Sequence, residues 1–589
     1  MSLRQRWVWE FDAPRERLWR YVADTDWVNR HAGLPAIQVR YEPLPDGGAR
    51  RIASFARGPV HVEWEERPTI WRVPVFFEVE RLYHRGPLAR FFNRTTLEAN
   101  GADRTRVVVD VELEAASALG EPLLLALAAH GKRGARRAFA LAAKLAHGDA
   151  IAVAPNRALG PWNRVRDAGV DEPIVKRLAA FVDTADDGEL QRIRPYELAD
   201  RWSVPRRAVL SAFLTATRLG LFNLRWSVLC PACRGPSPPI DSLDKLRRDY
   251  HCEACNLPFD AAFDRSVEVT FDARPLGRGT SSGLYCIANP QRSTHVLAQT
   301  TIAPHATQDV AVTLDAGRYQ LAQMGAGIAP FTSSSDTRTR RLDATIAGDG
   351  NLKAVAAVGT GDVSVRIVNA SSRDAVVRIE RSSWPDTIAT AAQVTALAEF
   401  RDLFSSEVLA PGLDLGIETL AVLFTDVVGS TAIYSKTGDA PAFRIVADHF
   451  DAMRATLAQH EGAIVKTIGD AVMAAFIDPV RCLEAAVDLD RSVRAIIAAG
   501  EPLRLRVGFH VGPCIAMRAN DRIDYFGTTV NLAARLQKLA GAGQVTLARS
   551  VAEREEIAER LGALATAFAS ESLEIKGFPE RIDVVRVVT

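Results

Sequence analysis

The chain has 589 residues, of which 48% are hydrophobic and 24% are charged, and its formal net charge is +1. A chain of this length is too long for one hydrophobic core, so it predicts about three to five domains. The near-neutral charge excludes a general attraction to nucleic acid or anionic membranes, and partners have to be inferred from local features.

The chain carries no predicted export or membrane signal. Its N-terminus has no apolar core of the signal-peptide type, and no stretch reaches the roughly eighteen uncharged apolar residues of a membrane span. The most apolar candidate, residues 122–146, is interrupted by basic or histidine side chains at His130, Lys132, Arg133, Arg136 and Arg137. Four of the seven cysteines form two C-x-x-C pairs and three are isolated, which favours reduced thiols. We therefore predict a cytoplasmic protein.

Residues 1–150 read as an α+β unit. A strand is followed by an amphipathic helix, a run of short strands and an Ala/Leu-rich helix that ends near residue 146. The opening EFDAPRERLWRYVADTDWVNRH resembles the START-like ligand-binding superfamily. That resemblance implies a curved sheet closed by the last helix and an apolar cavity for a small hydrophobic ligand. The alternative is that the aromatic residues only fill a core.

Residues 155–225 are predicted to be helical and similar to a winged helix, with two helices joined by a tight turn at SVP. Arg206 and Arg207 begin the second helix, where a DNA-binding protein would meet phosphate. The body of that helix has few side chains suited to reading bases, so a packing or dimerising role is favoured over nucleic-acid binding.

Residues 226–262 contain two C-x-x-C pairs, Cys230/Cys233 and Cys252/Cys255, separated by eighteen residues. This spacing predicts a zinc ribbon in which four thiolates hold one structural Zn²⁺. The segment has little core of its own, so the metal would supply its stability. His251 is a competing but unneeded ligand.

Two further segments precede the C-terminal third. Residues 263–385 contain short strands separated by Gly, Asn, Asp and Pro, which predicts a β-sandwich. Residues 386–416 are predicted to form a connector, helical to about residue 409 and ending at Pro411-Gly412. The apolar stripe of that helix predicts a packing partner; it consists of Val394, Leu397, Phe400, Phe404 and Val408.

Residues 417–589 carry three motifs, FTDVVGST, KTIGD and DYFGTTVNLAAR. The alternation of strands and helices follows the β-α-β-β-α-β order of a ferredoxin-like fold. Together the motifs resemble the class III adenylate/guanylate cyclase catalytic domain. The whole chain is then a multidomain α+β protein, in which the START-like, zinc-ribbon and sandwich segments form a regulatory region ahead of a catalytic domain.

The resemblance assigns a role to each motif. Cyclising a nucleoside triphosphate needs a deprotonated ribose 3′-hydroxyl and a neutralised triphosphate, which two Mg²⁺ or Mn²⁺ ions provide. The implied metal-binding residues are Asp426, Val427 and Asp470; the implied phosphate-binding residues are Gly429, Ser430, Thr431 and, more loosely, Lys576. Asn531 and Arg535, one helical turn apart, match the catalytic pair that stabilises the transition state.

Two positions decide whether the site accepts adenine or guanine. Adenine has an acceptor at N1 and a donor at N6, so a lysine and an aspartate complement it, whereas guanine reverses both. Lys466 and Asp524 occupy these positions. The resemblance therefore predicts an adenylate cyclase acting on ATP, with guanylate cyclase as the alternative.

Lys466 and Asp470 are too close along one hairpin to serve one nucleotide from opposite sides. In the family, the metal-binding residues and the base-reading residues of one site come from different subunits, so a head-to-tail homodimer with two sites is predicted.

Two other interpretations remain: a catalytically silent nucleotide-binding regulator, and a DNA-binding regulator, for which the neutral charge gives no support.

Overall fold

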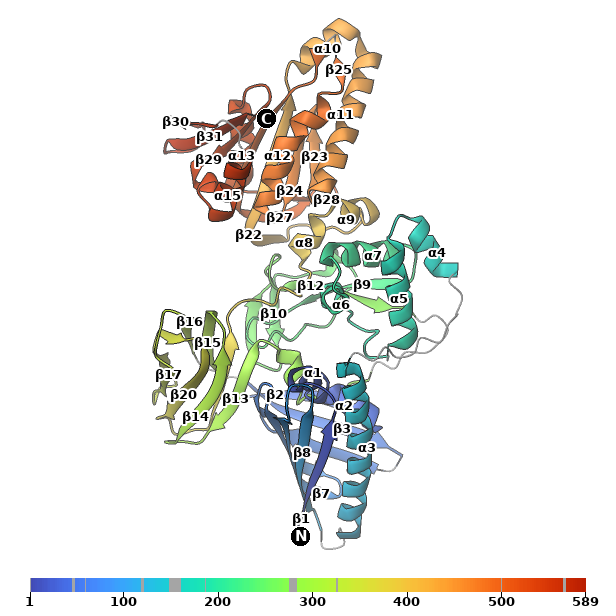
Figure 1. The fold of residues 1–589 in the computed structure, drawn as a ribbon, viewed down its shortest axis with the longest axis vertical. Coiled ribbons are helices and arrows are strands. Elements are labelled where there is room, and N and C mark those ends of the chain that lie inside the picture. The colour runs from blue at the N-terminus through green and yellow to red at the C-terminus, as the bar shows by residue number, and fades with distance from the viewer. Residues whose placement is uncertain are drawn as a thin grey trace.

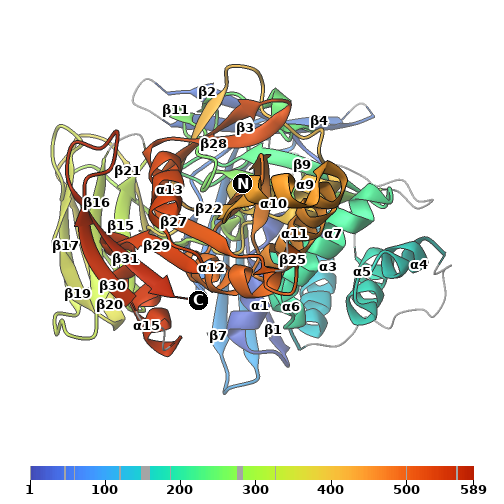
Figure 2. The same cartoon turned by 90° about the horizontal axis from the view of Figure 1, so that it is seen from above.

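The computed structural model describes residues 2–44, 48–58, 60–117, 121–147, 160–185, 187–274, 283–324, 327–498, 501–564 and 568–588. Its units are arranged along one long axis, with the N-terminal unit at one end and the C-terminal unit at the other (Figure 1). Seen from above, the two sheets of residues 296–381 lie to one side of that axis (Figure 2). The predicted limits near residues 148–159 fall outside the described residues.

The N-terminal unit is a curved antiparallel sheet closed by a long helix. Strand β1 (Ser2–Phe11) is followed by helices α1 (Arg15–Val22) and α2 (Thr25–Ala32). The remaining strands are β2 (Gln38–Pro43), β3 (Ala49–Arg57), β4 (Val60–Glu66), β5 (Ile70–Arg72), β6 (Phe76–Arg85), β7 (Leu88–Ala99) and β8 (Thr105–Ala115). Helix α3 (Glu121–His147) packs on α1, α2 and β1, and buries Phe139 against the sheet. The unit is α+β with one apolar core.

The central unit is a helical cluster with a two-stranded sheet. Its helices are α4 (Gly160–Asp167), α5 (Glu172–Thr184), α6 (Pro195–Trp202) and α7 (Arg206–Arg218), and its strands β9 (Phe222–Val228) and β12 (Val267–Ala273) pair antiparallel. Between these strands lie the four cysteines and the hairpin β10 (Asp249–Cys252) with β11 (Leu257–Asp260). The predicted limit at residue 263 is therefore wrong for β12, which pairs with β9 and not with the sandwich.

Two sheets that share one apolar core follow. One contains β13 (Val296–Ile302), β15 (Gly317–Gln323), β16 (Ile328–Ser334), β19 (Ala357–Gly359) and β21 (Ala375–Arg381); the other contains β14 (Thr307–Leu314), β17 (Arg341–Ile346), β18 (Leu352–Ala354) and β20 (Gly361–Asn369). Strand β13 also pairs with β5, so the first sheet is continuous with that of the N-terminal unit.

The connector differs from the single helix that we predicted. It forms two short helices, α8 (Ala391–Thr395) and α9 (Ala398–Leu403). Thr390 and Gln393 form a capping box that starts α8, and Leu397 has extended backbone angles that break the helix. The apolar stripe is nevertheless buried, because Val394 and Phe400 join the core shared by the central and C-terminal units.

The two arginines at the start of α7 are engaged within the chain. Arg206 forms ion pairs with Asp200 and Asp386. Arg207 forms an ion pair with Glu399 of α9 at 3.1 Å and donates to the carbonyl of Ala458 in the C-terminal unit at 3.2 Å. These side chains therefore join α7 to the connector and to the C-terminal unit, in line with the packing role.

The C-terminal unit is built on a mixed sheet covered by helices. Its strands are β22 (Asp414–Val427), β23 (Ala463–Ile468), β24 (Ala471–Phe476), β27 (Leu505–Ala519), β28 (Arg522–Phe526), β29 (Gln544–Ala548), β30 (Phe568–Leu573) and β31 (Ile582–Val588), and β25 (Ile497–Ala498) pairs with β26 (Glu501–Pro502) apart from it. The helices are α10 (Ser430–Thr437), α11 (Asp439–Gln459), α12 (Pro479–Val493), α13 (Thr528–Leu539), α14 (Arg549–Ala552) and α15 (Glu555–Ala563). The order β23-β24-β22-β27 is that of a ferredoxin-like sheet.

Helix α13 approaches the sheet closely at Gly508. A Cβ added there would lie 2.1 Å from the backbone nitrogen of Gln537. We expect Gly508→Ala to displace α13 and to lower the free energy of unfolding by about 3 kcal/mol. Thermal or denaturant unfolding measures this. Gly416→Ala is the matched control on β22, where an added Cβ meets nothing within 4 Å. An equal effect of the two substitutions would contradict the expectation.

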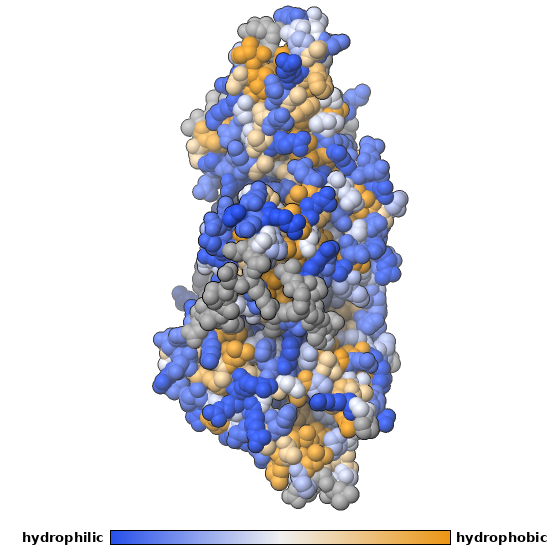
Figure 3. Space-filling view, turned by 90° about the vertical axis from the view of Figure 1, so that its right-hand side faces the viewer, coloured by the Kyte–Doolittle hydropathy of each residue, from blue (hydrophilic) through white to orange (hydrophobic). Residues whose placement is uncertain are grey.

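None of the described helices is long and apolar enough to cross a membrane. The face of the molecule in Figure 3 is mainly hydrophilic, and its hydrophobic residues form separate patches.

Candidate functional site in the C-terminal unit

The two predicted metal-binding aspartates lie at neighbouring strand ends. Asp426 is the penultimate residue of β22, and Asp470 lies in the tight turn between β23 and β24, after Gly469 with φ +65°. Strand β22 pairs with β24, which brings the two ends together. The turn needs a left-handed residue, which glycine supplies without steric cost.

Burial and the nearby Asp470 carboxylate raise the pKa of Asp426, while Arg506 and the carboxamide of Gln537 act in the opposite direction. A carboxylate whose charge is disfavoured by a second carboxylate nearby fits a site for divalent cations, which relieve that repulsion. Val427, which precedes the predicted phosphate-binding turn, is buried. The donor set therefore suits Mg²⁺ or Mn²⁺.

Sequence reasoning missed His449 as a neighbour of this site. His449 lies on α11 and is fully buried, and it lines a small cavity together with Asp470 and Ser430. Burial lowers the pKa of its imidazole, and the Asp470 carboxylate acts in the opposite direction. A histidine on an apolar helix face offers no local sign that separates this position from an ordinary core residue.

The predicted phosphate-binding residues follow β22 directly. Gly429 has φ +72°, and Ser430 starts α10, a helix whose first backbone amides have no partner within the helix and suit an anion. Thr431 lies in the same turn, but its side chain is outside the described part of the structure. Lys576 is exposed in a turn after β30. The structure thus groups the turn residues and leaves Lys576 without a defined relation to them.

Asn531 and Arg535 occupy successive turns of α13. Gly527 precedes the helix with φ +129°, and its carbonyl accepts from the Asn531 amide at 3.1 Å. Asn531 is exposed and Arg535 half-buried. Both side chains are therefore available to a ligand or a second chain.

The two predicted base-reading residues meet directly. Lys466 comes from β23 and Asp524 from β28, and the Lys466 Nζ lies 2.6 Å from the Asp524 Oδ2. The Asp524 Oδ1 accepts from the backbone amide of Tyr525 at 2.8 Å. The Asp524 side chain is 10% exposed and that of Lys466 is 36% exposed, so the lysine remains accessible. A donor and an acceptor thus stand side by side at the surface of the sheet.

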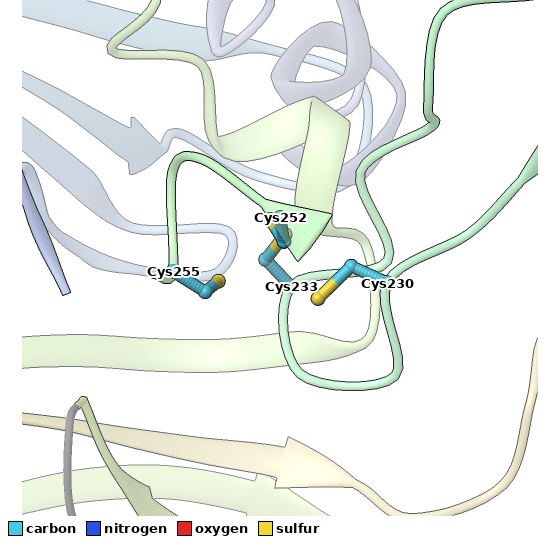
Figure 4. A group of neighbouring side chains, drawn as sticks. All are labelled: Cys230, Cys233, Cys252 and Cys255. Carbon is cyan, nitrogen blue, oxygen red and sulfur yellow. The ribbon is translucent and has the colours of Figure 1, made fainter. Parts of the chain in front are cut away.

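The four cysteines of the central unit also converge. Their Sγ atoms lie within 4.8 Å of one another, and Figure 4 shows them turned toward a common centre. The Cys233 and Cys252 Sγ atoms are 3.7 Å apart. With a Zn–S bond of about 2.3 Å, sulfur atoms in a tetrahedral site are separated by about 3.8 Å. The arrangement fits a structural Zn²⁺.

Two family models match the chain. Residues 416–577 match the adenylate and guanylate cyclase catalytic domain. That span contains β22, the β23–β24 turn and α13, and thus all of the clustered residues above except the cysteines. The C-terminal unit is a class III nucleotidyl cyclase domain. Residues 162–281 match a family of unknown function, and this match includes α4 to β12 together with the four cysteines.

Similar proteins include cyclases of both specificities. An uncharacterized protein of Mycobacterium tuberculosis is 30% identical over 226 residues, which cover 35% of this chain and 57% of that protein. A receptor-type adenylate cyclase of Trypanosoma brucei brucei is 26% identical over 28% of this chain and 16% of that protein. Retinal guanylyl cyclase 1 of Rattus norvegicus is 31% identical over 20% of this chain and 12% of that protein. The chain thus spans 57% of the mycobacterial relative and much less of the others.

Among solved structures, the adenylyl cyclase CyaB from P. aeruginosa is 21% identical with a TM-score of 0.27, and covers 30% of this chain and 96% of that chain. The catalytic core of a rhodopsin-guanylyl cyclase with converted specificity, in complex with ATPαS, is 22% identical with a TM-score of 0.27. That match covers 30% of this chain and 99% of the cyclase core.

Proposed function

We propose that the protein is an adenylate cyclase that converts ATP to 3′,5′-cyclic AMP and pyrophosphate. The observation that carries this proposal is the contact between Lys466 and Asp524, 2.6 Å apart, within a cyclase domain. In this pair the lysine is a donor suited to adenine N1 and the aspartate an acceptor suited to the N6 amino group. Guanine would place an acceptor, O6, against Asp524 and a donor, N1–H, against Lys466.

The remaining residues support the chemistry. Two divalent cations held by Asp426 and Asp470 would favour ionisation of the ribose 3′-hydroxyl and neutralise the triphosphate. The amides that follow β22 would hold the terminal phosphates. Asn531 would orient the ribose, and Arg535 would stabilise the charge that develops at the α-phosphorus. Each group then acts on a different part of one extended nucleotide.

A head-to-tail homodimer is part of this proposal. Lys466 and Asp470 belong to the same short hairpin, so one nucleotide cannot reach both from opposite sides. The strands that carry the base-reading pair, β23 and β28, and the neighbouring strand β27 also expose large apolar side chains: Ile468 is 54% exposed, Phe526 39% and Ile515 of β27 41%. Such a surface favours contact with a second copy of the domain.

We propose that the N-terminal unit binds a ligand and regulates the cyclase domain. A cavity of about 270 Å³ lies between α3 and the sheet, and its lining is mainly apolar, with Trp7, Phe77, Phe91 and Phe139 among the aromatic residues. The size and the lining suit a small hydrophobic ligand. The Zn²⁺ at the four cysteines would be structural, because sulfur fills all four coordination positions.

The specificity of the base-reading pair has a direct test. We expect the purified protein with Mg²⁺ or Mn²⁺ to use ATP with a kcat/KM about a hundredfold above that for GTP, because guanine leaves Lys466 and the largely buried Asp524 both facing the wrong hydrogen-bonding group. Exchanging the pair through Lys466→Glu and Asp524→Cys should reverse the preference. Liquid chromatography of cyclic nucleotide and pyrophosphate measures both.

Product from GTP and none from ATP would replace this proposal with guanylate cyclase. No product from either nucleotide, together with nucleotide binding, would support the silent regulator.

A further inference from the structure

Arg401 of α9 joins the connector to the strand that carries Asp524. Its Nε donates to the carbonyl of Thr395 at 2.7 Å, at the end of α8. Its Nη1 donates to the carbonyl of Ile523 at 3.1 Å, and its Nη2 lies 3.3 Å from the hydroxyl of Tyr525. One guanidinium thus connects the break between the two connector helices to both neighbours of Asp524.

Strand β28 depends on this contact because it is an edge strand. Among the described residues it pairs with β27 alone. The Ile523 carbonyl therefore has no ladder partner on the open side, and Arg401 supplies a donor there. The fully buried Tyr525 ring lies under the same guanidinium, with its centroid 5.6 Å from the Arg401 carbon Cζ.

The strand pattern then determines where Asp524 points. Side chains alternate along a strand, so Ile523 and Tyr525 face the connector while Asp524 faces the opposite side. There Asp524 meets Lys466 at 2.6 Å. A shift or rotation of β28 relative to α9 would move the Asp524 carboxylate, and with it the acceptor that distinguishes adenine from guanine.

We propose that Arg401 is a positioning residue that holds Asp524 in place and thereby sets the preference of the cyclase domain for ATP over GTP. This inference rests on the proposed function, because it takes Asp524 as the residue that reads the base. Arg401 acts through β28 and does not touch the nucleotide.

The chemistry of the contact requires an arginine. Three donors in one plane reach acceptors on α8, on the β28 edge and on a tyrosine ring, and a lysine ammonium on a flexible stem cannot hold all three directions. The acceptors are two carbonyls and a hydroxyl. Because none of these acceptors is a carboxylate, Arg401→Gln leaves no buried, unpaired charge behind. The fold should therefore survive the substitution.

The space beside Arg401 allows the strand and the connector to move apart. A cavity of about 360 Å³ lies between α9, α11, β23 and β28, and Arg401, Arg454, Lys466 and Ile523 line it. Arg207 of the central unit holds the same helix, α9, through Glu399 at 3.1 Å. A displacement of the central unit would therefore reach Asp524 through Arg401.

The test compares Arg401→Gln with Arg454→Gln in the full-length protein. Arg454 lines the same cavity, but its ion pair is with Asp402 at 3.6 Å and both side chains are more than half exposed. We expect Arg401→Gln to lower kcat/KM for ATP by about tenfold to a hundredfold while the value for GTP falls less, because a small misplacement of a binding group has effects of this size. Arg454→Gln should leave the ATP-to-GTP ratio within about twofold of wild type.

A second readout does not require turnover. Hydrogen–deuterium exchange of residues 522–526 should become faster in Arg401→Gln and stay unchanged in Arg454→Gln, since the β28 edge loses its donor only in the first. Tyr525→Phe, which removes one of the three contacts, should give an intermediate change.

The outcomes separate the two proposals. An unchanged ATP-to-GTP ratio in Arg401→Gln overturns the positioning role, and so does unchanged exchange of β28. An equal loss with both nucleotides also overturns it, because Arg401 would then act on the fold in general. If the wild-type protein cyclises neither nucleotide, the proposed function fails, and the exchange experiment still decides whether Arg401 holds β28.

Discussion

The cyclase activity of an Asp426→Asn variant is expected to fall by about a thousandfold or more with either nucleotide. Asparagine preserves the size of the side chain but removes one of two charges that would bind the divalent cations. Burial, and next to it the nearby Asp470 carboxylate, raise the pKa of Asp426. The fold should be retained, because removing a charge from this pair relieves repulsion. Asp439→Asn, at an exposed position in the first turn of α11, is the control.

Mixing this variant with Arg535→Ala tests whether the sites are shared between chains. Each variant alone should be inactive. In an equal mixture half of the dimers contain one chain of each kind, and one of their two sites then has both Asp426 and Arg535 intact, so activity should return to about a quarter of the wild-type value. Product formation after co-refolding or co-expression measures this. A mixture as inactive as its components would show that Asp426 and Arg535 of one site belong to one chain.

The cyclase domain could be predicted from the sequence because its functional residues lie within short motifs. Lys466 and Asp524 are 58 positions apart, and alternation of residue types alone gives no reason for them to meet. The resemblance to the cyclase family assigned both residues to the recognition of the base, and the structure places them 2.6 Å apart. The four cysteines could be grouped for a similar reason, since metal ligation restricts their spacing.

The pairing of strands that are distant along the chain could not be predicted from the sequence. The strand Val267–Ala273 has the alternation of a sandwich strand, but its partner, Phe222–Val228, lies on the other side of the cysteine segment. Strand patterns carry no record of the partner strand, so the domain limit was misplaced. The prediction of a single connector helix was wrong for a different reason. The apolar stripe has a helical period, yet the backbone of Leu397 is extended and separates α8 from α9. Arg401 has no local signature either, because its role depends on contacts more than a hundred residues away.

Removing one cysteine ligand is expected to have the largest effect on stability. Cys252→Ser should abolish zinc binding and lower the free energy of unfolding of the central unit by about 3 kcal/mol or more, because structural zinc sites contribute much of the folding energy of small segments. Between β9 and β12 the regular structure is limited to the short β10–β11 hairpin and one 3-10 turn, Leu243–Lys245. Metal analysis of the purified protein should give one Zn²⁺ per chain, and the variant should unfold about 6 °C or more below wild type.

We expect the loss of stability to extend beyond the cysteines, because Arg234, next to Cys233, contacts the end of the sandwich. Arg234 donates to the carbonyl of Arg381 at 2.9 Å and lies over the Trp384 ring. These residues lead directly into the connector, so limited proteolysis near residues 382–390 should accelerate in Cys252→Ser.

His251→Ala is the matched control, since His251 is exposed and adjacent to Cys252. It should retain zinc and stability, and a loss of metal in this control would make His251 a ligand. A wild-type protein that binds no zinc, and whose unfolding a chelator leaves unchanged, would contradict the structural role of the metal.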